Sequence, residues 1–313
     1  MNKFKAPLIY NFFKPVGISS HHVIRLFKKK LNCEVGKIGH FGTLDPFAGG
    51  VLLIGINSGT RINDYVHAEF AKTYLLIGVL GKETVTGDNT APISQTDTSR
   101  YLVENIKKFD IHFLNALLQD KFLGEYYQAP HVYSAAKFQG KKLHVWAKQG
   151  VNINLAPVKR YIYSLEIVKY AFPYLHLKVK ASSGTYMRTL FSDIARFLGT
   201  LGHLVGLIRT EIGPFNIYNG IKKSNFSDQI KNWDENFLLK HGNHIDDVLK
   251  YSKIVLDQES SIKFKNGVSV PAPHDRENKN WIYDFENQMI GLGEIYMDEN
   301  NTKKIRVVFN LAC

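Results

Sequence analysis

The amino-acid sequence predicts an α+β fold with a central mixed, largely antiparallel sheet flanked by helices, followed by a small β-rich C-terminal domain. Strand-like and helix-like stretches are intermixed without the strict alternation of a parallel α/β fold. The chain has 313 residues, of which 44% are hydrophobic, enough for one large domain and a smaller one. Beyond about residue 250, short apolar runs are separated by the turn signals "NG", "PAP" and "DEN". We therefore expect domains at 1–250 and 251–313, joined by a polar, amphipathic helical linker at residues 222–242.

The N-terminal part contains one clear helix and two buried strands. The helix is expected at residues 20–32, with Ser19 or Ser20 as its N-cap. Its apolar positions recur at helical spacing: Val23, Ile24, Phe27 and Leu31. The continuous apolar runs at residues 51–56 and 72–81 predict two strands that are buried on both faces.

The most regular strand signal lies at residues 174–181. Its buried face is predicted to hold Leu175, Leu177, Val179 and Ala181, and its other face His176, Lys178 and Lys180. After "SSG" the pattern becomes helical and ends at Gly199. The buried side of this helix is expected to consist of Met187, Leu190, Phe191, Ile194, Ala195 and Leu198.

The net charge of +12 and the pI near 9.4 favour a polyanionic partner, although general solubility charge would look the same. The 16 tyrosines offer surfaces on which bases could stack, but they are also ordinary core material. Cys33 and Cys313 lack metal-ligand spacing, so neither zinc nor a disulfide is expected. We expect neither a signal peptide nor a membrane span, and hence a cytoplasmic protein.

Asp45 is the first candidate for chemistry. It precedes a proline and lies in a glycine-rich bend, directly before the buried strand at 51–56. A carboxylate near a buried strand is costly unless something compensates for its charge. An aspartate before proline also occurs as a plain turn residue that accepts backbone hydrogen bonds. Both readings are open at this stage.

Arg188 is the second candidate. It falls in the first turn of the helix after "SSG", where the macrodipole disfavours a cation, and it lies off the apolar stripe of that helix. If it meets Asp45, its guanidinium would favour the ionised carboxylate and orient it. The alternative is an exposed arginine that pays a small electrostatic penalty.

Three further features carry weaker signals. His40 is also consistent with a simple loop residue, and Tyr74 with a packing residue. The basic stretch with Lys137, Lys141 and Lys142 includes Phe138 and Trp146, which suits either an RNA-gripping element or a solvated face. No Walker loop, dinucleotide fingerprint, HExxH motif or nucleophile elbow occurs in the sequence.

The stretch "GHFGTLDPFAGGVL" resembles the signature of the TruB family of tRNA pseudouridine synthases, G-H-x-G-T-L-D-P-x-A-x-G-V-L, at every fixed position. Other matching segments follow the same order along residues 8–220: "NFFKPVGISS", "KTY", "QAPHVYSAAKFQGKKLHVWAKQG", "SSGTYMRTL" and "GHLVGLIRT". The resemblance implies a pseudouridine synthase fold and conversion of uridine 55 in the T-arm of tRNA. The C-terminal part is similar, by position and β-rich character, to a PUA-type RNA-binding module.

The resemblance also assigns roles to individual residues. Asp45 would be the catalytic aspartate and Arg188 its ion-pair partner. Tyr74 would lie against the target base, His40 would take the space left by the flipped nucleotide, and Leu207 would form part of the apolar wall. The segment 125–150, with its lysines, would belong to an insertion that closes over the RNA. Three departures from the family pattern concern RNA contacts rather than chemistry: Phe41, Val85 and Ile208.

The implied reaction breaks the bond from ribose C1′ to N1 of uracil and joins C1′ to C5 of the turned base. Because it involves no water and no net redox change, we expect no cofactor and no metal. A single carboxylate must act as nucleophile or as base, and the sequence leaves open which. The target base must first flip out of its stack.

The expected partner is the T-arm stem-loop of tRNA, bound by a monomer without a membrane or an obligate protein partner. Two rival interpretations remain. One is a non-catalytic RNA-binding or RNA-folding protein, which would not need an intact acid site. The other is guide-dependent modification within a ribonucleoprotein, which would need partner proteins.

Overall fold

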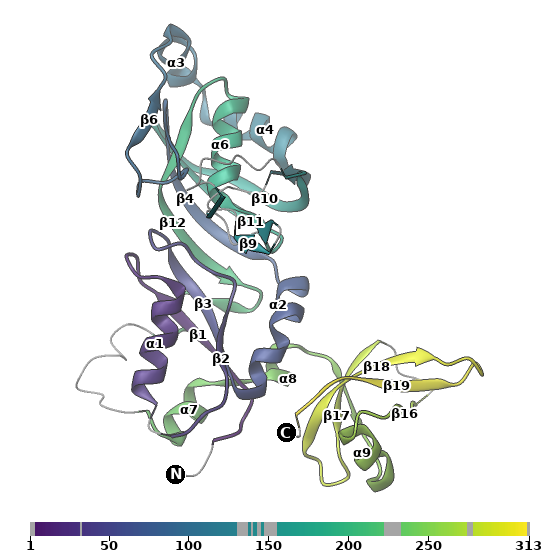
Figure 1. Ribbon diagram of the computed structural model, residues 1–313. Helices are drawn as coiled ribbons and strands as arrows, with labels where there is room; N and C mark the ends of the chain where they lie inside the picture. Colours follow the sequence, from purple (N-terminus) through teal and green to yellow (C-terminus); the bar gives the residue numbers. More distant parts are fainter. Residues whose placement is uncertain are drawn as a thin grey trace.

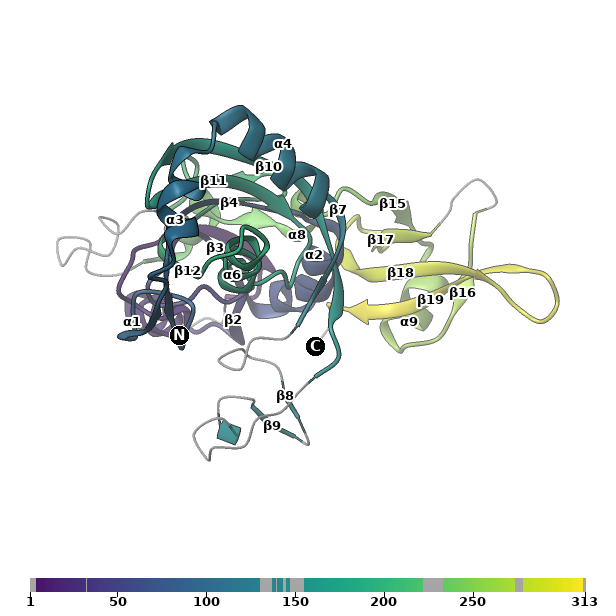
Figure 2. The same ribbon diagram turned by 90° about the horizontal axis from the view of Figure 1, so that it is seen from above.

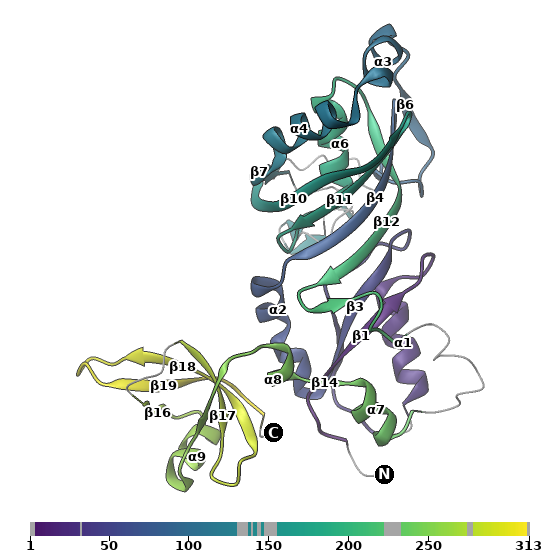
Figure 3. The same ribbon diagram turned by 180° about the vertical axis from the view of Figure 1, so that it is seen from behind.

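The structure is a computed structural model that describes residues 4–31, 33–129, 137–138, 140–142, 145–146, 155–221, 233–273 and 278–311. In this part of the chain, one large sheet with its helices forms the main body, and a smaller sheet projects from one end of it (Figures 1 and 3). The first helix and the first strands lie at the same end of the main body as the small sheet, and α3, α4 and α6 at the other (Figure 1).

The large sheet has ten strands within the described residues, and its neighbours run antiparallel except for β3 and β12, which are parallel. This confirms the predicted mixed, largely antiparallel sheet. In spatial order the strands are β14 (Asn243–His244), β1 (Leu8–Lys14), β3 (Gly49–Ile56), β12 (Gly202–Ile212), β4 (Lys72–Leu80), β11 (Tyr174–Ala181), β10 (Val158–Ala171) and β7 (Gly124–Gln128), with β2 (Ile38–Phe41) paired to β3 and β13 (Phe215–Asn216) to β12.

Helices α4 and α6 cover one face of the β12–β4–β11–β10 half of this sheet, and their apolar side chains share one hydrophobic cluster with those strands (Figure 2). The helices of the main body are α1 (Ser20–Lys30), α2 (Asn63–Glu69), α3 (Arg100–Glu104), α4 (Ile111–Phe122), α6 (Met187–Phe197), α7 (Glu235–His241) and α8 (Ile245–Val248), with short 3-10 helices at Asn57–Ile62 and Ile106–Lys108. A separate hairpin consists of β5 (Lys82–Thr84) and β6 (Ile93–Thr96).

The periodicity of the sequence predicts several of these elements closely. Strand β11 has the predicted bounds, and its four apolar residues are the buried ones. Helix α1 starts at Ser20, and its N-cap is Ser19, whose hydroxyl accepts a hydrogen bond from the His22 amide at 3.1 Å. The six residues predicted for the buried side of α6 are all buried, and Gly199 follows the helix with a φ of +80°.

The segment predicted to be a linker, residues 222–242, is in part packed into the main body. Residues 222–232 lie outside the described residues, but the segment after them packs into the main body instead of bridging two domains. Trp233 is fully buried, and its ring contacts Phe27 of α1 at a centroid distance of 5.0 Å. Leu238 of α7 joins the same hydrophobic cluster. The apolar side chains of this polar-looking segment therefore decide its position.

The C-terminal region is β-rich, as predicted. Its five-stranded sheet has the order β15 (Ser252–Val255), β17 (Lys279–Tyr283), β18 (Met289–Met297), β19 (Lys303–Asn310) and β16 (Val270–Pro271), with α9 (Gln258–Lys265) packed beside it. Trp281 connects the two sheets: its indole donates a hydrogen bond to the Leu249 carbonyl at 2.7 Å, and its ring joins an apolar cluster with Val66 of α2. The division into domains at residue 250 stays a prediction.

Gly50 of the signature segment allows the parallel contact between β3 and β12. It has a φ of +107°, and a Cβ at this position would lie 2.1 Å from the Arg209 carbonyl oxygen. We expect Gly50→Ala to lower the free energy of unfolding by about 3 kcal/mol, because backbone strain adds to a clash with backbone that cannot move aside.

Gly267→Ala is the matched control, because Gly267 also has a positive φ, +82°, but open space around its Cβ position. It should cost only about 1 kcal/mol, the strain contribution alone. Urea unfolding followed by circular dichroism measures both variants. Equal losses would show that the close approach of the two strands is unimportant.

Candidate active site

A cavity of about 400 Å³ lies where the middle strands of the large sheet meet the start of α6. The cavity brings together the five candidate residues named from the sequence: His40 on β2, Asp45 in the bend before β3, Tyr74 on β4, Arg188 on α6 and Leu207 on β12. The basic candidates Lys137, Lys141 and Lys142 lie on β8 (Lys137–Phe138) and β9 (Lys141–Lys142), which pair with each other, and their side chains fall outside the described part of the structure.

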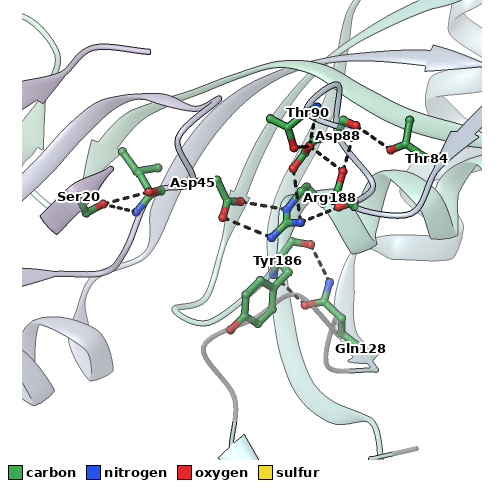
Figure 4. Close-up of polar contacts among 10 residues, drawn as sticks. Ser20, Asp45, Thr84, Asp88, Thr90, Gln128, Tyr186 and Arg188 are labelled. Carbon is green, nitrogen blue, oxygen red and sulfur yellow. Dashed lines mark hydrogen bonds and ion pairs between the residues drawn. The ribbon is translucent and has the colours of Figure 1, made fainter. Parts of the chain in front are cut away.

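Asp45 and Arg188 form a two-point ion pair (Figure 4). The Nε atom of Arg188 lies 3.0 Å from Oδ2 of Asp45, and its Nη2 donates to Oδ1 at 3.3 Å. The arginine side chain is only 5% exposed, whereas the aspartate side chain is 34% exposed. The guanidinium is therefore fixed inside the protein, while the carboxylate faces the cavity.

Asp88 is a second acidic partner of Arg188, which the sequence did not single out. Its Oδ2 lies 3.5 Å from Nη1 of Arg188, and the same Nη1 donates to the Thr86 carbonyl at 2.6 Å. The hydroxyls of Thr86 and Thr90 and the Thr90 amide donate to Oδ1 of Asp88. Three donors and a guanidinium therefore hold this buried carboxylate.

The segment around Asp88 shows why sequence reasoning missed it. "ETVTGDNT" reads as a polar turn, and an aspartate in a turn normally has a local role. Val85 of this segment, which departs from the family pattern, is 57% exposed. The aspartate three residues later is the one that turns inward. The need for a second carboxylate becomes evident only from the burial of Arg188. A buried guanidinium is poorly compensated by a single, partly exposed acid.

The bend that carries Asp45 is held by neighbouring strands and helices. Gly42 takes a left-handed conformation, with φ +76°, and its carbonyl accepts a hydrogen bond from Arg209 at 2.9 Å. The Ser20 hydroxyl bonds both backbone groups of Leu44, accepting at 2.9 Å and donating at 3.0 Å. The residue before Asp45 is thus fixed on both sides, so the direction of the carboxylate is determined by backbone contacts.

Burial raises the pKa of the Asp45 carboxyl above its ordinary value, and the Arg188 guanidinium is the largest influence that lowers it again. The nearby Asp88 carboxylate adds to the rise, and the Lys14 ammonium opposes it. The effect of Arg188 agrees in sign with the expectation that it favours the ionised acid. The net direction is upward, so the ion pair only partly offsets the cost of burial.

The rest of the wall contains apolar and aromatic side chains as well as polar ones. Tyr74 is 7% exposed and contacts Arg209, and Leu207 is 6% exposed. The Nδ1 atom of His40 is buried and has no hydrogen-bond partner among the described residues, and burial lowers the pKa of this imidazole. A cavity-lining imidazole with an unpartnered ring nitrogen has hydrogen-bonding capacity left for a ligand.

Tyr186, another residue that the sequence did not single out, lines the cavity at the N-cap of α6. Gln128 at the end of β7 fixes its backbone, accepting from the Tyr186 amide at 2.8 Å and donating to its carbonyl at 2.9 Å (Figure 4). This pair connects the end of β7 to the start of the helix that carries Arg188.

Residues 28–187 match the family described as "TruB family pseudouridylate synthase (N terminal domain)". The chain is also 34% identical over 287 residues to the tRNA pseudouridine synthase B of Caldanaerobacter subterraneus subsp. tengcongensis, an alignment that covers 91% of this chain and 94% of that protein. The chain belongs to the TruB family of pseudouridylate synthases. The tRNA pseudouridine synthase B of Clostridium acetobutylicum is 33% identical over 296 residues, covering 92% of this chain and 95% of that protein.

Among solved structures, the TruB-family chain is similar to a chain in "Crystal Structure of a Cbf5-Nop10-Gar1 Complex", with a TM-score of 0.66 and 22% identity over 97% of this chain and 84% of that one. It is also similar to a chain in "Structure of H/ACA RNP bound to a substrate RNA containing 2'-deoxyuridine", with a TM-score of 0.59 and 22% identity over 96% of this chain and 83% of that one. These likenesses concern the fold, which agrees with the predicted pseudouridine synthase type.

Two further findings concern only the described residues. No group of three or more His, Cys, Asp or Glu side chains in this part of the TruB-family chain is arranged to hold a metal ion. Nor does the described part contain a helix long and apolar enough to span a membrane.

The electrostatic coupling between Arg188 and Asp45 can be tested directly. In Arg188→Met, the pKa of Asp45 should rise further, because the largest influence that lowers it is removed while burial and Asp88 remain. NMR titration of the carboxyl carbon measures this pKa. Arg196→Met is the control, since Arg196 lies on the same helix but is 58% exposed and pairs with Glu83. An unchanged pKa of Asp45 in Arg188→Met would contradict the coupling.

Proposed function

We propose that this TruB-family enzyme converts uridine 55 in the T-loop of tRNA into pseudouridine, with Asp45 as its catalytic residue. The observation that carries the proposal is the Asp45–Arg188 ion pair at the cavity, in which Asp45 belongs to a signature segment matched at every fixed position from Gly39 to Leu52. The curated relatives of similar length are named tRNA pseudouridine synthase B. Their name supports tRNA as the substrate, and the family signature supports position 55.

The proposed chemistry needs one carboxylate at the reacting nucleoside. The C1′–N1 bond of the uridine breaks, the uracil turns within the cavity, and a C1′–C5 bond forms; C5 loses its proton and N1 takes one up, so that the product is an isomer of the substrate. Asp45 acts at the sugar or the base as nucleophile, or takes a proton as base; carboxylates attack glycosidic carbons in retaining glycosidases. Arg188 contributes by holding both carboxylate oxygens in a fixed direction.

Access to Asp45 requires base flipping, because a stacked uridine in an RNA loop cannot reach an acid inside a cavity. Extrusion costs a few kcal/mol, which stacking on an aromatic side chain offsets in part. Tyr74 would supply that contact, Leu207 an apolar wall, and His40 would fill the space the base leaves. A cavity of about 400 Å³ is in the range of small-ligand sites and is large enough to hold a detached uracil.

The rest of the chain would grip the RNA. The insertion at about 125–150, with Lys137, Lys141 and Lys142, would close over the arm, and residues 251–313 would act as a PUA-like RNA-binding domain. The net charge of +12 supports this contact with a polyanion. We propose that the enzyme acts as a monomer without a guide RNA or protein partner, in the cytoplasm, where bacterial tRNA is found.

Replacing the acid tests the catalytic assignment. Asp45→Asn should abolish pseudouridine formation while RNA binding survives, because the amide keeps the shape but loses the nucleophilic charge. Tritium release from C5-labelled uridine in a T-arm hairpin measures turnover, and filter binding measures affinity. Asp247→Asn, at an exposed acid of α8, is the control and should turn over normally. Substantial turnover by Asp45→Asn would remove the residue from the mechanism.

Changing the cation tests the geometry of the pair. Arg188→Lys should reduce turnover by about a hundredfold, because an ammonium cannot make two parallel contacts to Asp45 and also hold Asp88. The same tritium assay measures it, and a near-normal rate would show that the fork geometry is not needed.

A purified protein and an unmodified tRNA transcript test the substrate. Pseudouridine should form at position 55 without other components, and a transcript with cytidine at that position should gain none. Carbodiimide mapping locates the product. Binding without product would favour the RNA-folding interpretation, and activity only with added protein or guide RNA would favour the ribonucleoprotein interpretation.

A further inference from the structure

The cavity has a second polar region that the roles proposed above do not use. It consists of Lys72 at the start of β4, His67 on α2 and Arg209 on β12, called here the Lys72 cluster. Lys72 is 4% exposed and Arg209 1% exposed, yet both line the cavity. A buried ammonium and a buried guanidinium therefore lie in the same wall, near the bend that carries Asp45.

The Lys72 cluster is fixed by neutral groups. Arg209 donates from Nε to the Val51 carbonyl at 2.8 Å and from Nη2 to the Gly42 carbonyl at 2.9 Å. The Nζ atom of Lys72 lies 3.3 Å from Nδ1 of His67, which in turn lies 3.0 Å from the Ser183 hydroxyl. These contacts hold the side chains in place without neutralising them.

The positive charge of the cluster has no internal counterpart. Among the described residues, no carboxylate lies within ion-pair distance of Lys72 or Arg209, and the main influences on Lys72 are burial and the Arg209 guanidinium. Together they lower the pKa of Lys72 to about 7, and burial with Lys72 lowers that of His67 to about 4. Arg188, which lines the same cavity, has two carboxylates. The two groups of cations in the cavity wall therefore differ in charge balance.

We propose that Lys72 and Arg209 form an anion subsite that takes one phosphodiester group of the RNA backbone next to the target nucleotide. This assignment rests on the proposed function and adds a binding role for residues outside the Asp45–Arg188 pair. A phosphate matches the site because it carries a permanent negative charge, which an ammonium and a guanidinium bind through charge-assisted hydrogen bonds. It would also anchor the sugar on the side of the cavity where the bend at Gly42 leaves no room for a side chain: a Cβ there would lie 2.8 Å from Nζ of Lys72.

A subsite of this kind makes the free protein less stable than it could be. Burying an ammonium without a counterion costs free energy, and only the bound RNA repays it. Lys72→Met, which keeps the length of the side chain and removes its charge, should therefore raise the midpoint of thermal unfolding of the free protein. A purely structural lysine would give the opposite result, because its removal would leave His67 without its contact.

The binding test uses T-arm hairpins in which one phosphodiester at a time, near the target uridine, is replaced by a neutral methylphosphonate. All variants carry Asp45→Asn, so that binding is measured without turnover. With Lys72 present, one particular replacement should weaken binding about tenfold, the worth of a charge-assisted contact. Lys72→Met should bind the unmodified hairpin about tenfold more weakly. The methylphosphonate at that linkage should not weaken the binding of Lys72→Met any further. Lys72→Arg retains the positive charge, so the same methylphosphonate should still weaken its binding.

Lys82→Met is the control, since Lys82 is an exposed lysine just beyond the other end of β4 and should change neither the unfolding midpoint nor the linkage pattern. The proposal is overturned if Lys72→Met lowers the unfolding midpoint. It is also overturned if the Lys72→Met loss is the same on every methylphosphonate hairpin, which would indicate contact with a base. Because these readouts need no catalysis, failure of the proposed function would be seen separately, as a lack of pseudouridine in the transcript assay with Asp45 intact.

Discussion

The structure depends on one buried guanidinium that two carboxylates share. Arg188 lies in the first turn of α6, where the helix dipole disfavours a cation, and it is almost completely removed from water. Either condition would be costly for an unpaired arginine. Asp45 and Asp88 make the position tolerable, and in doing so they tie the bend before β3 and the turn at residues 84–90 to the same helix. The catalytic candidate is thus part of the interaction that holds three segments together.

The frame around this interaction explains why the acid remains accessible. Ser20, at the start of α1, and Arg209, on β12, fix the bend through backbone atoms of Leu44 and Gly42, just before Asp45. Gly50 lets β3 approach β12 closely, and β3 is buried along its whole length. The carboxylate therefore projects from a rigid edge into the cavity, with 34% of its side chain exposed, while its partner stays inside. A rigid acid beside a fixed cation costs little reorganisation when charge develops on a substrate.

Local periodicity predicted those parts of the fold that are decided locally. The alternation in β11 and the apolar stripe of α6 each follow from one buried face, so their bounds could be read directly. Pairing between distant segments leaves no such trace. Asp45 and Arg188 are 143 residues apart, and their meeting depends on the order of strands in the sheet. The family resemblance assigned roles to both residues, but it said nothing of Asp88, which the threonines of its own turn hold in place. Trp233 likewise was predicted to be part of a linker, because the residues around it are polar. Its burial depends on an aromatic contact with Phe27, which the local pattern does not reveal.

The cavity combines two opposite electrostatic arrangements, and this difference is itself informative. Around Arg188 the protein supplies its own counterions, Asp45 and Asp88. Internal counterions keep the charged groups in one geometry throughout a reaction. Around Lys72 the protein supplies cations fixed by neutral groups only, and the free protein bears the cost. A chain with a net charge of +12 has many exposed lysines that could meet RNA at no such cost. A buried lysine has an advantage over an exposed one where the phosphate must be held in one position and not merely attracted to the surface. A buried cation can be satisfied only by an anion that enters the cavity, so it selects RNA in which the nucleotide has already left its stack.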